Sequence, residues 1–204
     1  MSVPFGKRKE SQFETLHHYF QLRDNVNELL MNQFGYSEER YRKSIEKFRE
    51  GNKNNPNVED IVRKKEEKCQ FYKKWFIEDE IYAISKYLRD IGTELTVANS
   101  IYPSSSPAKV IEYLERRHHI TKSITYCYAL KQEINYVIHS LPVDINKFER
   151  FDESINKQIA LLKGMRKSAN KFINGSDNTI IDNQILQVLN NACKIMSMVI
   201  GTIK

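Results

Sequence analysis

Apolar side chains recur at helical spacing from Val58 to about Asn99, and this long pattern constrains the fold more than any other feature. No proline interrupts it, and its single glycine, Gly92, costs a helix only about 1 kcal/mol relative to alanine. Such a period places the apolar side chains on one helix face, which must be buried against a partner. We expect this core face to consist of Cys69, Tyr72, Phe76, Ile84, Leu88, Ile91, Leu95 and Ala98.

Further apolar patterns predict helices before and after this one. We expect them over about residues 11–34, 107–141, 145–173 and 179–203. The corners between them carry turn residues, as at 102–107 and 142–144. No stretch alternates in the manner of a strand, and short corners favour antiparallel neighbours. The predicted fold is therefore all-α, an antiparallel up-down bundle of four to five long helices with an extra N-terminal helical segment.

Two breaks divide the chain. Residues 1–10 have the composition of a flexible basic tail, and 51–57, with the sequence Gly-Asn-Lys-Asn-Asn-Pro-Asn, form the clearest linker. We therefore predict an N-terminal helical segment and linker over 11–57, including a short charged helix after Ser37, and a helix-bundle domain over 58–204.

The composition points to a cytoplasmic protein. The N-terminus has no apolar run, so we expect no signal peptide, and no stretch reaches the roughly 20 apolar residues of a membrane span. The three cysteines, Cys69, Cys127 and Cys193, lie far apart and form no CxxC pair. We interpret them as buried free thiols in a reducing compartment.

The stretch between Ser154 and Ser176 is basic and contains no Asp or Glu. The formal net charge of the chain is +6, and five of these six units come from this stretch. A local cationic surface on an otherwise balanced helical protein is typical of contact with a polyanion or an acidic partner. The basic residues are Lys157, Lys163, Arg166, Lys167 and Lys171.

Helical spacing places the lysines of this stretch in a row. Lys163, Lys167 and Lys171 are four residues apart and lie on one face, whereas apolar residues such as Leu162 and Ala169 lie roughly opposite. A solvated helix face is the alternative interpretation. The missing acids favour a functional contact, because ordinary exposed helices intersperse Glu among their lysines.

A second polar cluster occupies residues 115–119, Glu-Arg-Arg-His-His. Adjacent histidines project about 100° apart on a helix and cannot hold one metal as an i,i+4 pair does, so we expect no metal site here. Arg116 and Arg117 are weaker candidates for phosphate contacts. Spacing places Arg117 near the apolar seam, where Glu80 would be its partner, either as a structural ion pair or as part of a site.

Nothing in the sequence has the spacing of a catalytic or cofactor motif. The segment Lys163-Gly164-Met165-Arg166-Lys167-Ser168 lacks the preceding strand and the second glycine of a phosphate loop. No nucleophile elbow or Ser/His/Asp arrangement is present. We therefore expect no enzyme activity and no cofactor, and an enzyme built around Glu80 and Arg117 is the weakest alternative.

The last expected helix, over 179–203, is apolar around more than half of its circumference and carries only Asp182 and Lys194 as charges. Such a helix must be covered on more than one side. Either it is central in the bundle or it seals a subunit interface, and its terminal position favours a homo-oligomer.

Three pieces of the sequence resemble one family. They are Ala98-Asn99 at the end of one helix, the Leu141-Pro142 corner after the helix with Arg116-Arg117, and Leu161 to Ser168. Together they are similar to the accessory variability determinants, four-helix-bundle proteins of diversity-generating retroelements. The likeness covers roughly residues 80–171, and Met165 stands where that family tends to have Trp. The resemblance implies a ring-shaped homo-oligomer that binds a reverse transcriptase and its template RNA without catalysis, through Lys163, Arg166 and Lys167.

The sequence thus leads to two hypotheses of different classes. The first is a non-catalytic RNA-binding accessory of a reverse transcriptase, in which phosphates contact Lys157, Lys163, Arg166, Lys167 and Lys171 with Arg116 and Arg117. The alternative is a protein-interaction module whose basic row docks an acidic protein surface. RNA and DNA are not distinguished at this level.

Overall fold

The computed structural model describes residues 13–101 and 109–174, and within these ranges every regular element is helical. The α-helices are α1 (Phe13–Met31), α2 (Glu38–Gly51), α3 (Val58–Phe71), α4 (Ile77–Ser100), α5 (Lys109–Ser140) and α6 (Glu149–Asn174). A π-helical segment (Tyr72–Phe76) joins α3 to α4, and 3-10 turns lie at Gln33–Gly35 and Ile145–Lys147. The prediction of an all-α fold is confirmed.

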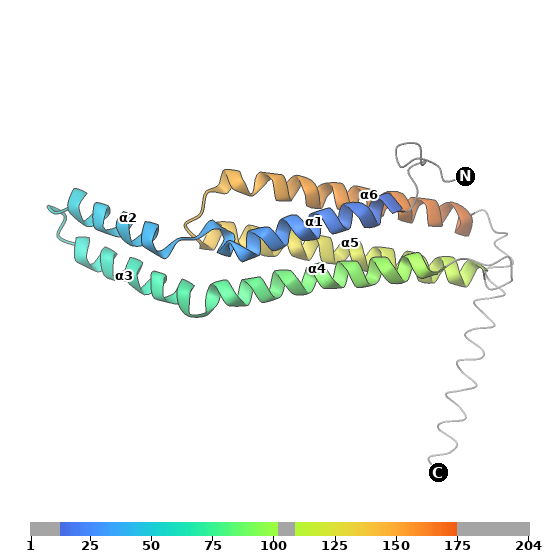
Figure 1. Cartoon of the computed structure of the whole chain (residues 1–204), viewed down its shortest axis with the longest axis horizontal. Coiled ribbons are helices and arrows are strands. Elements are labelled where there is room, and N and C mark those ends of the chain that lie inside the picture. Colours follow the sequence, from blue (N-terminus) through green and yellow to red (C-terminus); the bar gives the residue numbers. More distant parts are fainter. Residues whose placement is uncertain (1–12, 102–108, 175–204) are drawn as a thin grey trace, which may run out of the picture.

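Four of the helices form an antiparallel bundle (Figure 1). α4 packs on α5, α5 on α6, and α1 lies against both α4 and α6, which closes the ring. The chain runs up and down through α1, α4, α5 and α6 in turn. The boundary expected at residue 57 is therefore wrong, because α1 belongs to the bundle and shares its core.

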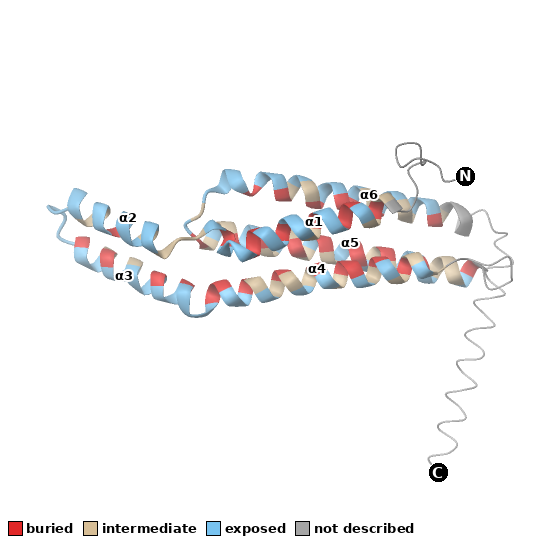
Figure 2. Ribbon diagram, in the orientation of Figure 1, coloured by how far each residue is buried: buried red, intermediate tan, exposed pale blue. Residues whose placement is uncertain are grey.

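The core runs along the centre of this bundle, where the buried faces of the four helices meet (Figure 2). All eight residues predicted as the core face of 58–99 are buried. α5 and α6 contribute the same kind of stripe, as the helical period predicts. Their buried residues include Ile120, Ile124, Cys127, Leu130, Ile134, Ile155, Ile159 and Leu162.

A glycine lets α1 approach α4 closely. The Tyr19 hydroxyl donates a hydrogen bond to the Leu88 carbonyl oxygen at 2.8 Å, and the Tyr19 ring lies over Gly92. A Cβ atom at Gly92 would come within 3 Å of that ring, at 2.6 Å from Cζ and 2.9 Å from Cε1. Gly92 is therefore needed for the contact between α1 and α4. The sequence indicated only its small cost to helix stability and not this packing role.

Polar side chains fix α1 against α6. His18 Nδ1 lies 2.7 Å from Gln158 Oε1, and Gln158 Nε2 donates to the Thr15 carbonyl oxygen at 3.2 Å. All three residues are buried. Because a buried polar group without a partner is costly, sliding α1 along α6 would be penalised.

The α2–α3 hairpin extends beyond one end of the bundle (Figure 1). A small core of its own, formed by Ile45, Val58 and Val62, holds the two helices together. The predicted linker 51–57 forms the tip of this hairpin, and the charged helix expected after Ser37 is α2, with Ser37 as its N-cap. This hairpin, and not the whole of 11–57, is the appendage.

The end of α1 differs from the expected helix over 11–34. α1 ends at Met31, and Gln33, Phe34 and Gly35 follow with positive φ angles of 47°, 60° and 76°. This left-handed turn places Phe34 in the core, where it is 1% exposed. Within α1, Phe20 is 50% exposed, whereas Tyr19 and Leu22 are buried.

Some expectations fall on residues that the structure does not describe. They are the basic tail over 1–10, the corner at 102–107 and the apolar helix over 179–203, including Cys193. The homo-oligomer predicted from that last helix therefore stays a prediction. Across the described helices, none is both long and apolar enough to cross a membrane.

Candidate nucleic-acid interface

The outward side of α6 is cationic and lined by small residues. Lys163 and Lys167 are exposed there, in agreement with the predicted row, and Lys157 is exposed as well. Between Ser154 and Asn170 the other exposed residues are small or neutral, namely Asn156, Ala160, Gly164 and Ser168. Because no bulky side chain stands between the lysines, a large anionic partner can approach this side of the helix closely.

A second acid-free segment lies beside this one. Residues 116–132 of α5 contain four Lys or Arg residues and no Asp or Glu. α5 and α6 pack antiparallel, and contacts between Lys131 and Asn156 and between Tyr128 and Lys163 set their register. This register places 116–132 alongside the acid-free part of α6, so two segments without carboxylates lie side by side.

Tyr128 of α5 stands next to the lysine row. Lys163 Nζ donates a hydrogen bond to the Tyr128 hydroxyl at 2.9 Å and lies 5.6 Å from the centre of the Tyr128 ring. Tyr128 is still 48% exposed. An exposed aromatic ring beside a lysine can stack on an unpaired base while the ammonium group contacts phosphate.

Two carboxylates at the borders of this region, Asp152 and Glu94, already have partners. At one end, Asp152 forms an ion pair with Lys131 at 2.7 Å and accepts a hydrogen bond from Asn156 at 2.9 Å. Toward α4, Glu94 contacts His119 at 2.6 Å and Lys122 at 3.5 Å. Within the described part of the chain, Lys157, Lys163 and Lys167 form no ion pair.

The other candidate residues are placed unequally. Arg117 is exposed, on the rim of α5 that carries Tyr128, and Arg166 is half-buried. Arg116 is only 7% exposed. Contrary to the expectation from sequence, it does not contribute to the outer surface. Lys171 belongs to α6, but its side chain lies outside the described residues. We define the basic face as Arg117, Tyr128, Lys157, Lys163 and Lys167.

The proposed pairing of Arg117 with Glu80 does not occur. Glu80 lies near the start of α4, and the charge that faces it from α5 belongs to Glu133. Arg117 precedes Glu133 by 16 positions, which is about 24 Å along a helix. At this separation the two residues form no ion pair, and Glu80 Oε2 has no hydrogen-bond partner among the described residues.

Glu80 is nevertheless an unusual carboxyl group, because its side chain is 6% exposed on the core face of α4. Burial, followed by the charges of Glu133 and Asp79, raises the pKa of Glu80 to about 7. This carboxyl group is therefore partly protonated near neutral pH. Elsewhere in the core, burial raises the pKa of the Cys127 thiol of α5 to about 12, so this thiol stays protonated.

The histidine pairs do not build a metal centre in the described part of the chain, where no three His, Cys, Asp or Glu residues come together in a ligand cluster. His17 lies 3.1 Å from Gln21, and His18 belongs to the α1–α6 hydrogen bonds. His119 is held by Glu94, and its ring contacts that of His118. Each pair is thus divided between different neighbours.

Two parts of this interface were not predicted from the sequence. The acid-free run in α5 can be read directly in the sequence, but only the helix register shows that it lies beside the run in α6. Tyr128 is one of 11 tyrosines, and nothing in its local sequence marks it as the one beside Lys163.

Comparisons with known proteins add no assignment. No protein-family model matches this chain, and neither a curated protein nor a solved structure matches it significantly.

Proposed function

We propose that this protein binds nucleic acid, RNA in the first place, through the basic face and performs no catalysis of its own. The observation that carries the proposal is the alignment of two acid-free helical segments, one on α5 and one on α6. Arg117 of α5 and Lys157, Lys163 and Lys167 of α6 are exposed on this side of the bundle and form no ion pair within the described residues, an arrangement suited to electrostatic contact with a phosphate backbone.

The binding mode follows from the shape of this surface. At about 1.5 Å per residue, the acid-free part of α6 over 154–174 is about 30 Å long. Lys157, Lys163 and Lys167 contact phosphates along this length, and Tyr128 stacks on a base that is not paired. Contacts to phosphates carry no sequence information, so the protein discriminates little between sequences.

The resemblance to the accessory variability determinants adds a partner to this proposal. Its range, roughly residues 80–171, spans α5 and most of α4 and α6, and it includes the whole basic face. In this proposal the protein acts beside a reverse transcriptase and holds its RNA. Assembly into a homo-oligomer would place several copies of the basic face on one strand and multiply the affinity.

The salt dependence of RNA binding tests the proposal. Fluorescence anisotropy with a labelled single-stranded RNA is measured over a series of salt concentrations, for wild type and for a Lys157→Gln, Lys163→Gln, Lys167→Gln variant. We expect this variant to bind about 100-fold more weakly at low salt, with a slope of log K against log salt shallower by about 2. The matched control replaces Lys47, Lys64 and Lys68 of the hairpin by Gln. We expect its affinity for RNA and its salt slope to equal those of wild type.

Two results would overturn the proposal. One is the absence of RNA binding at low ionic strength by a folded wild-type protein. The other is an equal loss of affinity in the basic-face variant and in the hairpin control, which would show that only total charge matters. Repeating the measurement with DNA of the same sequence determines whether the 2′-hydroxyl contributes.

A second candidate function is a protein-interaction module, favoured by exposed aromatic residues near the π-helical segment. Phe71 and Trp75 pack edge to face at 4.6 Å and are 39% and 49% exposed. Tyr136 of α5, 52% exposed, lies 5.6 Å from Phe76. Exposed Trp and Tyr side chains are frequent anchors of protein interfaces. A protein partner that remains bound after nuclease treatment, and is lost in Trp75→Ala but not in Tyr82→Ala, would support this function.

A further inference from the structure

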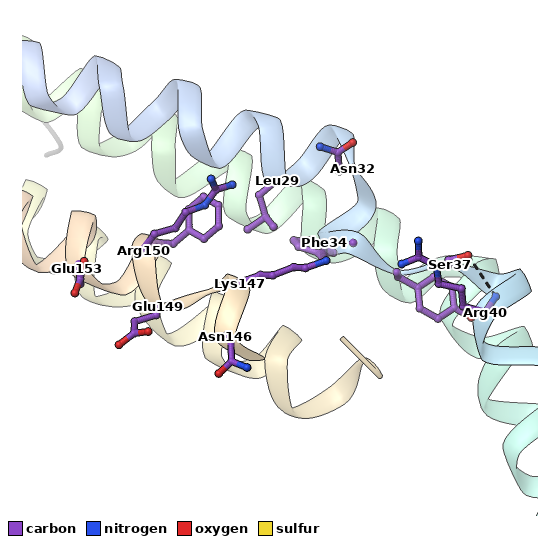
Figure 3. Close-up of a pocket in the computed structure, with 13 residues that line it drawn as sticks. Leu29, Asn32, Phe34, Ser37, Arg40, Asn146, Lys147, Glu149, Arg150 and Glu153 are labelled. Carbon is purple, nitrogen blue, oxygen red and sulfur yellow. Dashed lines mark hydrogen bonds between the residues drawn. The ribbon is translucent and has the colours of Figure 1, made fainter. Parts of the chain in front are cut away.

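A cavity of about 920 Å³ lies at the end of the bundle where the hairpin departs (Figure 3). Its walls come from the end of α1, the left-handed turn, the start of α2 and the first turns before and within α6. This volume lies in the range of small-molecule sites. The apolar part of its wall includes Leu29, Phe34 and Phe151.

Three cations lie along this cavity. Lys147 reaches across it toward Phe34, with Arg150 on one side and Arg40 on the other (Figure 3). The two acidic residues of the wall, Glu149 and Glu153, are directed away from Lys147. The cavity therefore presents a row of positive charge even though carboxylates stand nearby.

Local contacts hold the side chain of one of these cations and the backbone of another. The Arg150 guanidinium lies 4.6 Å from the centre of the Phe151 ring, and a guanidinium stacked in this way keeps its N–H donors free for a ligand. Arg40 sits in the first turn of α2, where its backbone N–H donates to the N-cap Ser37 at 3.4 Å. Among the described residues, none of the three cations forms an ion pair.

We propose that this cavity binds the phosphate groups of a polyphosphate-bearing ligand. Two arginines bind phosphate oxygens in the bidentate manner that suits a guanidinium, and Lys147 between them adds a compact charge. Because the cations form a row, the site fits several linked phosphates better than a single one. The site lies outside the basic face, so this proposal does not depend on whether RNA binds there.

Calorimetric titration of the full-length protein tests the site, with inorganic tripolyphosphate and ATP as probes. We expect saturable binding of tripolyphosphate, weakened about tenfold in Lys147→Gln and in Arg40→Gln, and unchanged in the matched control Lys64→Gln on the hairpin. Both substitutions are at exposed positions, so we expect the variants to fold. Circular dichroism and the melting temperature check this.

The source of the phosphates is distinguished by a third probe, an RNA carrying a 5′-triphosphate compared with the same RNA carrying a 5′-hydroxyl. ATP binding that depends on Lys147 identifies a free nucleotide, whereas a Lys147-dependent preference for the triphosphate strand identifies the end of an RNA. Either result supports the site. Tripolyphosphate heats that do not saturate by about 1 mM, or that are equal in wild type, Lys147→Gln and Arg40→Gln, overturn it.

Discussion

The α2–α3 hairpin and the outward side of α6 are both rich in cations, but they differ in whether carboxylates lie among those cations. On the hairpin, and at Lys73 just after it, several cations pair with a nearby carboxylate, although others such as Lys47, Lys64 and Lys68 form no ion pair within the described residues. The pairs are Arg42–Glu38 at 2.9 Å, Lys43–Glu39 at 2.6 Å, Arg63–Asp60 at 3.1 Å, Arg49–Glu59 at 3.3 Å and Lys73–Glu38 at 3.2 Å. On α6, the described lysines of the basic face have no such partner.

This difference separates the amount of charge from its availability. Interspersed charges of both signs stabilise an exposed helix slightly and largely cancel one another, as on the hairpin. The described lysines of α6 form no ion pair with a carboxylate, so they lack this stabilisation and repel one another. In an isolated protein this repulsion between the lysines only lowers stability. A partner that neutralises them recovers the loss. The arrangement of charge, and not the lysine content, is therefore the argument for binding at α6.

Converting the α6 surface into a hairpin-like one should have the largest effect. In an Ala160→Glu, Gly164→Glu variant, each new carboxylate has a lysine three residues away, at Lys163 and at Lys167. We expect RNA affinity at low salt to fall about 10- to 100-fold, because the new charges repel phosphate and occupy the lysines. Fluorescence anisotropy measures the change.

The neutral variant Ala160→Gln, Gly164→Gln is the control for bulk. If it lost as much affinity as the Glu variant, shape and not charge would govern binding, and the contrast with the hairpin would lose its meaning. Unfolding by urea should show no loss of stability in the Glu variant, because its new pairs have the spacing that stabilises helices.

An unpaired charge in the interior should act on stability instead of binding. The pKa of Glu80 is raised to about 7 in the folded protein, from 4.5 for an ordinary glutamate. The folded state therefore holds this proton more tightly, and its contribution to stability is complete below pH 4.5 and lost as the pH rises through about 7. At pH 8 we expect Glu80→Gln to be about 1–2 kcal/mol more stable than wild type.

Denaturant unfolding at several pH values measures this effect. The difference between Glu80→Gln and wild type should shrink as the pH falls from 8 to 4.5. Glu78→Gln, an exposed neighbour on the same helix, is the matched control and should show no such trend. A constant difference across this range would mean that Glu80 does not titrate as described.

The helices were predictable from sequence because helical periodicity is a local property. The core face from Cys69 to Ala98 needed only the spacing of apolar residues. The place of α1 was not predictable in this way, because it depends on Tyr19 meeting Gly92, residues remote in sequence. We would expect Gly92→Ala to separate α1 from α4.

The basic face was predictable in part for the same reason. The lysine row could be predicted from the helical spacing within one helix. To place the acid-free segment of α5 beside it, the register between two helices had to be known. Arg116 and Arg117 were misplaced because a helix turns by about 100° per residue. The buried Ile120 lies four positions after Arg116, so Arg116 follows the core face and Arg117 points outward.

A glycine on each region permits a smaller test. Gly164 lies inside α6 and Gly51 is the last residue of α2, and a Cβ at either position would meet nothing within 4 Å. We expect Gly164→Ala to stabilise the protein by about 0.5–1 kcal/mol through helix propensity. RNA affinity should stay the same, because no charge changes. Urea unfolding provides the measurement.

Gly51→Ala is the counterpart on the hairpin. Propensity matters less at a helix end than inside, so its gain should be the smaller one. Equal gains at the two positions would contradict the description of Gly164 as an open position in the helix interior. A loss of stability at Gly164 would mean that another part of the molecule covers α6.

The smallest effect is expected on the hairpin itself, from Glu38→Gln. Glu38 pairs with Arg42 and Lys73, which together hold its pKa below the usual value, and all three side chains are open to water. Exposed pairs contribute little and are screened by salt. We expect a slight fall in the melting temperature at low salt that disappears at high salt, with RNA affinity unchanged. A rise in RNA affinity would instead show that Arg42 and Lys73 bind RNA once they are unpaired, and the contrast between the two regions would then rest on ion pairing alone.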